Sequence, residues 1–209
     1  MDLRRSMLFG HREVTPYSAS IQDTTGKLWT AEKWDGTATP NGIAVRDKSY
    51  GPPDGILISI PQSTPSKVRF ASSSSYSIEG KGILDATKDY GGAQNTKTIA
   101  QIIPNSPAIT ACTGYTFPNG QKGYLGAFGE ILLITRLRNE IDECLLALGG
   151  SSLLSVMSDY IWSSTVSNYS TTQLYVWSST PAQGGAGVNG NQATATNSRY
   201  VWPIGKIDY

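Results

Sequence analysis

Residues able to do acid–base or nucleophilic chemistry are few in this 209-residue chain. The single histidine, His11, lies in a basic N-terminal stretch, so histidine-assisted catalysis and most zinc sites lack their usual residues. Cys112 and Cys144 are 32 positions apart and are expected to be buried thiols, with a disulfide as the alternative. Asp85 and Asp89 flank a turn and could form a carboxylate pair, but a solvated loop is the favoured interpretation. No activated nucleophile is indicated, and the chain is predicted not to be an enzyme.

Motifs for cofactors and modification are weak. Gly123, Gly126 and Gly129 recur every three residues, but no strand leads into a phosphate-binding turn, so close packing where a helix begins is favoured. Asn168-Tyr169-Ser170 matches the glycosylation sequon, a pattern that is common by chance. The sequence contains neither a P-loop nor an EF-hand loop, and we predict no cofactor and no metal.

The most unusual stretch runs from Tyr160 to Trp202. In it, 24 of 43 residues are Tyr, Trp, Ser, Thr or Asn, and only Arg199 is charged. Tyr and Trp provide large, rigid contact area at low entropic cost, and Ser and Asn add adaptable hydrogen bonds, as in binding loops. Such a segment is either a recognition surface or a β core. We expect both, with strands that hold the segment and outward side chains that bind.

Composition limits the class of protein. The net charge is +1 and charged residues make up 16% of the chain, so no electrostatic footprint for nucleic acid exists. No apolar run approaches the ~18 residues that cross a bilayer, and no membrane insertion is predicted. The 22 glycines and 11 prolines favour short strands and turns. Residues 1–26 are expected to be an arm or linker, and residues 27–209 a single domain.

The elements that position these residues follow from hydrophobic patterning. Residues 43–45 and 56–60 are predicted strands, and 61–98 a long polar loop with a short helix near 95–103. Four more strands are expected late in the chain: 160–165, 173–178, about 187–194 and 200–207. In the second of them, Leu174 and Val176 alternate with Tyr175 and Trp177, the period of a strand with one buried face.

Two helices are predicted between these strand regions. Apolar residues recur at helical spacing from Phe128 to Thr135. Asn139 is then expected to cap a second helix whose first turn is acidic. Gly149-Gly150 ends this helix, and the division between the two lies near Arg138.

Several strings in this order resemble one family. They are GYLGAFGEILLI (123–134), NEIDECLLALGG (139–150), YIWSSTVSN (160–168) and SRYVWPI (198–204), with LWTAEKW (28–34) and PNGIAV (40–45) upstream. Together they resemble the C-type-lectin-like domain of the formylglycine-generating-enzyme type. This variant occurs in bacterial surface proteins, gut-bacterial ones among them, and in variable proteins of diversity-generating retroelements such as the phage major tropism determinant.

The resemblance implies a fold and a function. The fold would be α+β, a C-type lectin fold with two helices packed on short antiparallel sheets. The function would be display of a ligand- or receptor-binding face, with residues of about 160–204 diversified by a retroelement. The partner would be a bacterial surface receptor, protein or glycan, and the location a phage tail-fibre tip or a bacterial surface as an adhesin. The phage relatives are trimers, so a homotrimer is expected.

The chain also departs from the family. Gly126-Ala127 stands where the family tends to have Pro-Ser, and Trp202 replaces the usual Arg of the last strand. The enzymes of the superfamily use a cysteine pair near their active groove, but Cys112 and Cys144 precede the recognition segment, so that activity is not carried over. Calcium-site motifs of sugar-binding lectins are missing as well.

Retroelements randomise adenines in codons such as those of Asn, which become Ser, Thr, Tyr and other residues. The bias toward these types between Ser167 and Tyr200 fits that process, and it also fits ordinary selection for binding. Trp162, Leu174, Val176, Val201 and Ile204 are expected to pack inside. The predicted ligand-binding residues are Ser167, Asn168, Tyr169, Ser170, Thr171, Thr172, Tyr175, Trp177, Asn189, Asn191, Thr194, Thr196, Asn197 and Tyr200.

Two alternatives stay open. A catalytic member of the superfamily would have a deep pocket with converging polar groups, containing Cys112 or a carboxylate. A structural fimbrial or surface module would instead carry a large apolar interface over residues 160–202.

Overall fold

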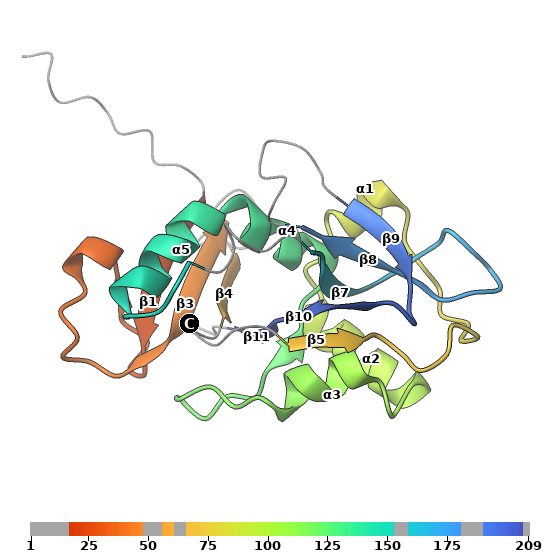
Figure 1. The fold of residues 1–209 in the computed structure, drawn as a ribbon, viewed down its shortest axis with the longest axis horizontal. Helices are drawn as coiled ribbons and strands as arrows, with labels where there is room; N and C mark the ends of the chain where they lie inside the picture. Colours follow the sequence, from red (N-terminus) through yellow and green to blue (C-terminus); the bar gives the residue numbers. More distant parts are fainter. Residues whose placement is uncertain (1–16, 48–55, 61–65, 153–158, 181–189, 207–209) are drawn as a thin grey trace, which may run out of the picture.

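A computed structural model of the chain describes residues 17–47, 56–60, 66–152, 159–180 and 190–206. These residues form two sheets that follow one another along the long axis, with five α-helices packed on them (Figure 1). The predicted α+β class is therefore confirmed. His11 and Asn189 lie outside the described residues.

The first sheet contains the earliest and the latest strands of the described chain. Its order is β2-β1-β3-β4-β11-β6, and neighbouring strands are antiparallel. Because β1 lies between β2 and β3, the predicted arm of residues 1–26 extends too far, and its later part is a sheet strand. The strands are β1 (Tyr17–Asp23), β2 (Leu28–Trp29), β3 (Pro40–Asp47), β4 (Ile56–Ile60), β6 (Tyr124–Leu125) and β11 (Pro203–Lys206).

The second sheet holds the aromatic-rich segment. Its order is β5-β10-β7-β8-β9, with β10 parallel to β7 and the other neighbours antiparallel. The single strand predicted over 200–207 is two strands, one in each sheet, separated by the fully buried Trp202. The strands are β5 (Ser66–Arg69), β7 (Ile161–Ser167), β8 (Tyr175–Ser179), β9 (Gly190–Thr194) and β10 (Ser198–Val201).

Two helices lie where the periodicity predicts them. They are α4 (Phe128–Arg136) and α5 (Arg138–Ala147), and the chain passes between them at Leu137. Asn139 is therefore inside α5 and is not its N-cap, which corrects the prediction. Gly149 has a φ of +78° just after α5, the left-handed conformation typical of a glycine that ends a helix.

The predicted long loop contains regular structure. Besides β5, the helix α1 (Ile83–Ala86) lies within residues 61–98. The helix α2 (Gly92–Ile102) is the short helix predicted near 95–103 and begins slightly earlier. A short 3₁₀ helix η1 (Ala31–Lys33) lies earlier in the chain. The helix α3 (Pro107–Gly114) was not predicted. The sequence signal for this helix is Ser106-Pro107. The Ser106 hydroxyl caps the helix by accepting a hydrogen bond from the Ile109 N–H at 3.3 Å, and Pro107 occupies the first turn.

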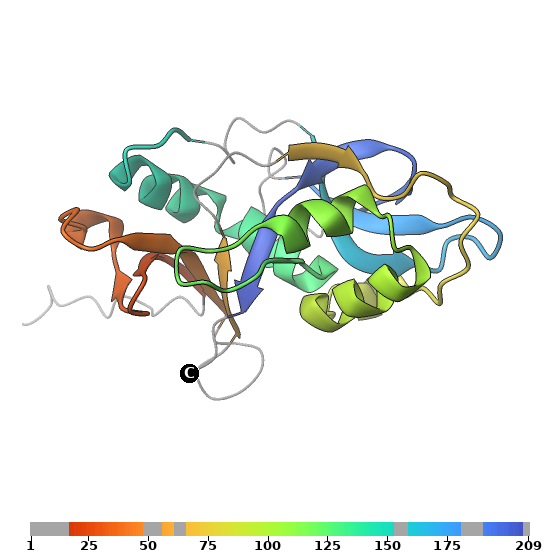
Figure 2. The same cartoon turned by 90° about the horizontal axis from the view of Figure 1, so that it is seen from below.

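The helices cover different faces of the sheets. Figure 2 shows α2 and α3 in front of the second sheet, and Ile99 and Ile109 from these helices share a core cluster with Trp162. The helix α5 packs on the first sheet, and α4 packs against β8. A methyl group at Gly126 would overlap Ile204, and one at Gly129 would lie 2.7 Å from the Asp89 carbonyl oxygen, so these glycines serve close packing. Among the described residues, no helix is both long and apolar enough to span a bilayer.

Candidate functional site

A surface turn between β7 and β8 carries most of the exposed predicted residues. The Ser170 hydroxyl accepts hydrogen bonds from the N–H groups of Thr172 and Gln173 at 3.2 and 3.1 Å. The Ser167 hydroxyl accepts one from the Tyr169 N–H at 3.2 Å. Because Ser hydroxyls replace backbone partners in this way, the polar sequence SNYSTTQ folds as an ordered turn.

The Tyr169 ring of this turn pairs with the ring of Tyr175, the first residue of β8. The Tyr169 side chain is 66% exposed, and its ring centroid lies 4.8 Å from that of the half-buried Tyr175. Asn168, Thr171 and Thr172 beside them are exposed. The turn and the start of β8 therefore present two tilted rings in contact, surrounded by uncharged amide and hydroxyl groups.

The predicted site residues do not all lie on this turn. Tyr200 lies on β10, on the far side of β7 from β8, with its ring centroid 5.7 Å from the Lys67 ammonium. Exposed members of the predicted set are Asn168, Tyr169, Thr171, Thr172 and Asn197. Half-buried members are Ser170, Tyr175, Asn191, Thr194, Thr196 and Tyr200.

Two predicted residues are buried, which corrects their expected exposure. Trp177 is only 5% exposed, since its ring packs against Phe128 with 5.3 Å between centroids. Its indole N–H donates to the Lys81 carbonyl oxygen at 3.0 Å. The Ser167 side chain is 2% exposed. The alternation in β8 suggested one buried face, but α4 covers the other face at Trp177.

Residues from far upstream complete the surface. A hollow of about 370 Å³ separates the turn from the segment 76–80, and Tyr76, Ile78 and Glu79 line its other side. Helix α1 follows this segment and exposes Ile83 and Leu84. Figures 1 and 2 both place the segment and the turn at the same end of the molecule. These residues were missed, because the Ser-rich stretch predicted only a polar loop.

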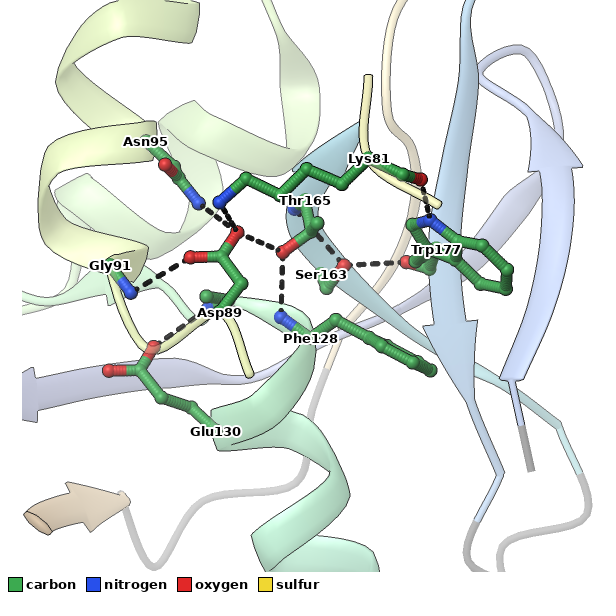
Figure 3. A network of polar contacts seen from close by, with 10 residues as sticks. Lys81, Asp89, Gly91, Asn95, Phe128, Glu130, Ser163, Thr165 and Trp177 are labelled. Carbon is green, nitrogen blue, oxygen red and sulfur yellow. Dashed lines mark hydrogen bonds and ion pairs between the residues drawn. The ribbon is translucent and has the colours of Figure 1, made fainter. Parts of the chain in front are cut away.

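A buried polar network holds the two halves of this surface together (Figure 3). The Lys81 ammonium lies 3.0 Å from Asp89 Oδ2, which also accepts hydrogen bonds from the Thr165 hydroxyl at 2.8 Å and the Asn95 amide at 2.9 Å. The Gly91 N–H donates to Asp89 Oδ1 at 3.1 Å. Asp89 is thus 6% exposed, and the expectation of a solvated loop is wrong for it.

The network reaches β7 and α4. The Thr165 hydroxyl accepts a hydrogen bond from the Phe128 N–H at 2.8 Å, which connects β7 to the start of α4. Lys81 is joined to β7 through its backbone, because its N–H donates to the Val166 carbonyl oxygen at 2.8 Å. Asp89 therefore fixes the segment that carries the upstream half of the surface.

The electrostatics keep Asp89 charged. Burial disfavours its anion, but hydrogen bonds from Lys81, Thr165, Gly91 and Asn95 more than offset this, and the pKa of Asp89 is lowered. A carboxylate with a lowered pKa and several donors already bound is a poor general base.

A smaller hollow of about 120 Å³ lies beside the network, lined in part by Lys81, Asp89, Asn95 and Ser164. The Ser164 hydroxyl is buried and has no hydrogen-bond partner within the described residues. No group of three or more His, Cys, Asp or Glu side chains that could hold a metal occurs in the described part of the chain.

The two cysteines are buried free thiols, as predicted. Burial raises the pKa of Cys144 to about 11, and burial likewise raises the pKa of Cys112. Both belong to core clusters and line neither hollow. Thiolate chemistry at either residue is therefore disfavoured.

The chain matches no protein-family model, no curated protein sequence and no solved structure.

Proposed function

We propose that this chain is a ligand-binding display protein that uses the β7–β8 turn and the upstream segment beside it to recognise a bacterial surface receptor. The main support is the ring pair of exposed Tyr169 and half-buried Tyr175, which stands among uncharged polar side chains. Aromatic anchors surrounded by replaceable polar contacts are the arrangement found at binding hot spots.

The scaffold under the turn supports the same proposal. The Asp89 network and the buried Trp177 hold the backbone below the exposed residues. Side chains at the surface can then vary at little cost to the fold, since function resides in sites carried by a scaffold. Display in several copies, as a homotrimer at a phage tail-fibre tip or as a bacterial adhesin, would raise weak single-site binding.

The finer fold assignment is part of this proposal. A C-type lectin fold of the formylglycine-generating-enzyme subtype is supported by the sequence of segments 123–134, 139–150, 160–168 and 198–204 and by two successive helices packed against short sheets. The last strand of the described residues, β11, pairs with β4 and so joins the sheet of the early strands.

The proposed diversification makes a prediction about the encoding DNA. A near-copy of the codons for residues 160–204 is expected near a reverse-transcriptase gene, with differences mainly at adenines. Because buried side chains tolerate little change, the differences should fall in codons for exposed residues such as Asn168 and Thr171 and spare Trp162 and Trp177. Sequencing the flanking DNA tests this, and differences spread evenly over buried and exposed codons would contradict it.

The binding role makes a second prediction. The double variant Tyr169→Ala, Tyr175→Ala is expected to bind intact gut-bacterial cells at least about tenfold more weakly, since two anchors worth about 1–2 kcal/mol each are lost. Leu146→Ala is the control, because Leu146 is exposed on α5, away from the turn. Flow cytometry with labelled protein measures both. Equal binding by the double variant and the wild type would place the site elsewhere.

The two alternatives have less support. An exposed apolar interface over residues 160–202 would favour a structural module, but within the described part of that range Tyr169 is the one large apolar side chain that is exposed. An enzyme would need a reactive group in a hollow. Two carboxylates, Glu79 and Asp89, line the smaller hollow; Glu79 is exposed, and Asp89 is held in its charged form by several donors.

A further inference from the structure

The segment Tyr76–Gly80 belongs to no helix or strand and has open hydrogen-bonding capacity. Exposure alternates along it, with Ser77 and Glu79 exposed and Tyr76, Ile78 and Gly80 half-buried, the period of a β-strand. Tyr76 and Ile78 pack on the core cluster that contains Trp162. Within the described residues, these five residues make no hydrogen bond, either through their backbone or through their side chains.

Both ends of this segment are nevertheless attached to the second sheet. At one end, the Leu174 N–H donates to the Ser74 carbonyl oxygen at 2.6 Å. At the other end, Lys81 forms a parallel bridge with Ser167, and the Asn168 N–H donates to the Lys81 carbonyl oxygen at 3.3 Å. Between these attachments, the segment and the turn stand apart and enclose the hollow of about 370 Å³.

Gly80 sets the geometry of the closed end. A Cβ at this position would overlap the backbone of Ser167, so no larger residue allows the same approach. The segment thus meets β7 at Lys81 and then diverges from it, and the hollow lies between the segment, the end of β7 and the turn.

The direction of the backbone groups follows from alternation along an extended chain. The N–H and C=O groups of Lys81 both point toward β7. In a parallel pairing, residues two apart direct their groups to the same neighbour, so Glu79 and Ser77 are expected to direct theirs into the hollow.

We propose that this hollow is a strand-addition site, in which an extended polypeptide segment of the partner pairs with the backbone of Ser77 and Glu79. Unpaired strand edges are templates for such pairing, and main-chain hydrogen bonds then supply affinity while side-chain pockets supply specificity. The volume lies within the range of sites for small ligands or a few residues of chain. Among the described residues that line it, Glu79 alone is charged, so neutral or basic side chains of the partner are favoured.

This inference deepens the proposed function, because it identifies an extended polypeptide as the ligand. A glycan is disfavoured on the same observations, since it has no backbone amides to match the regular spacing of Ser77 and Glu79. The turn would then contribute Asn168, Ser170 and Gln173 as the opposite wall.

The test starts from peptides selected on the full chain. A display library of random short peptides is selected on the immobilised protein, and the affinity of each binder is measured by calorimetry. N-methylation of alternate amides in a binder should weaken binding about tenfold at one set of positions and little at the other, because only one set faces the segment. Binding should also slow hydrogen exchange of the amides of residues 76–80.

Matched protein variants complete the experiment. Glu79→Pro removes the N–H donor and keeps an extended backbone, and it should weaken peptide binding about tenfold, whereas Glu79→Ala should change it less than about threefold. If the proline variant unfolds, the N-methyl series still tests backbone pairing, because it leaves the protein unchanged.

Three results would overturn the inference. They are failure to select any peptide, protection from exchange that lies outside residues 76–80, and equal effects of N-methylation at all positions. If one of these occurs while the Tyr169→Ala, Tyr175→Ala variant still loses binding to bacterial cells, the display function stands and the strand-addition site is wrong.

Discussion

Replacing Trp177 with alanine is expected to lower the free energy of unfolding by about 3–5 kcal/mol, the usual cost of removing a fully packed Trp. The ring is 5% exposed and packs against Phe128, so the substitution leaves a cavity between β8 and α4. It also leaves the Lys81 carbonyl oxygen without the indole donor. Urea denaturation followed by far-UV circular dichroism measures the change.

Two further variants separate the scaffold from the surface. Tyr169→Ala removes a side chain that is 66% exposed and should change stability by no more than about 0.5 kcal/mol. Trp177→Phe keeps an aromatic ring against Phe128 but loses the hydrogen bond, so it should cost less than the alanine change. If Trp177→Ala unfolds at the wild-type urea concentration and only ligand binding is lost, the tryptophan is a contact residue and the burial argument fails.

Local patterns in the sequence predict much of the fold. The β-branched run 56–60 forms β4, and the apolar period from Phe128 forms α4. Gly149 ends α5 because a left-handed residue is needed there, a requirement that glycine meets at any position in any fold. These signals lie within a few residues of the element they specify, which is why they can be read without coordinates.

Burial of the second face of a strand is not local information. The alternation along β8 assigns Trp177 to the exposed face of the strand, and it is buried only because α4 packs over β8. The same reasoning explains Asp89, whose partner Thr165 lies 76 positions away in the sequence. A carboxylate in a turn that ends in glycines is usually solvated, so no pattern near Asp89 indicates the buried network.

The candidate site also has one part that local sequence predicts and one part that it does not. The turn 168–173 was predicted as a surface because its Ser, Thr and Asn residues have no other local use. Its opposite wall, 76–80, comes from about ninety residues upstream and depends on the close approach of Gly80 to Ser167. Sheet register decides that approach, and register follows from the packing of the whole sheet.

Stability of the folded chain is expected to fall as pH rises from 5 to 8, through Glu130. This side chain is 3% exposed and accepts hydrogen bonds from the Ala127 N–H at 2.7 Å and the Tyr124 hydroxyl at 2.9 Å. Burial raises its pKa to about 8, and the nearby Asp89 charge adds to this, although the hydrogen bonds act in the opposite direction. The folded state therefore retains a proton that the unfolded state releases near the ordinary value of 4.5.

The sign follows from proton linkage. Between pH 4.5 and about 8 the folded chain binds more protons at Glu130 than the unfolded chain, so stability decreases with pH, by at most about 1.4 kcal/mol per unit. Asp89 has a lowered pKa and acts in the other direction, with stability lost only as pH falls below its ordinary value of 3.8. A measurement from pH 5 to 8 therefore isolates Glu130 from Asp89.

Glu130→Gln is the matched variant, because it keeps the shape and an acceptor for the Ala127 N–H at the start of α4 but has no proton to lose. Urea unfolding of both proteins at several pH values in this range should give a curve for the variant that is flatter than that of the wild type. Subtracting the two curves removes every other titrating group that both proteins share. Parallel curves would mean that Glu130 is already ionised in the folded state, and that its hydrogen bonds outweigh the cost of burying its charge.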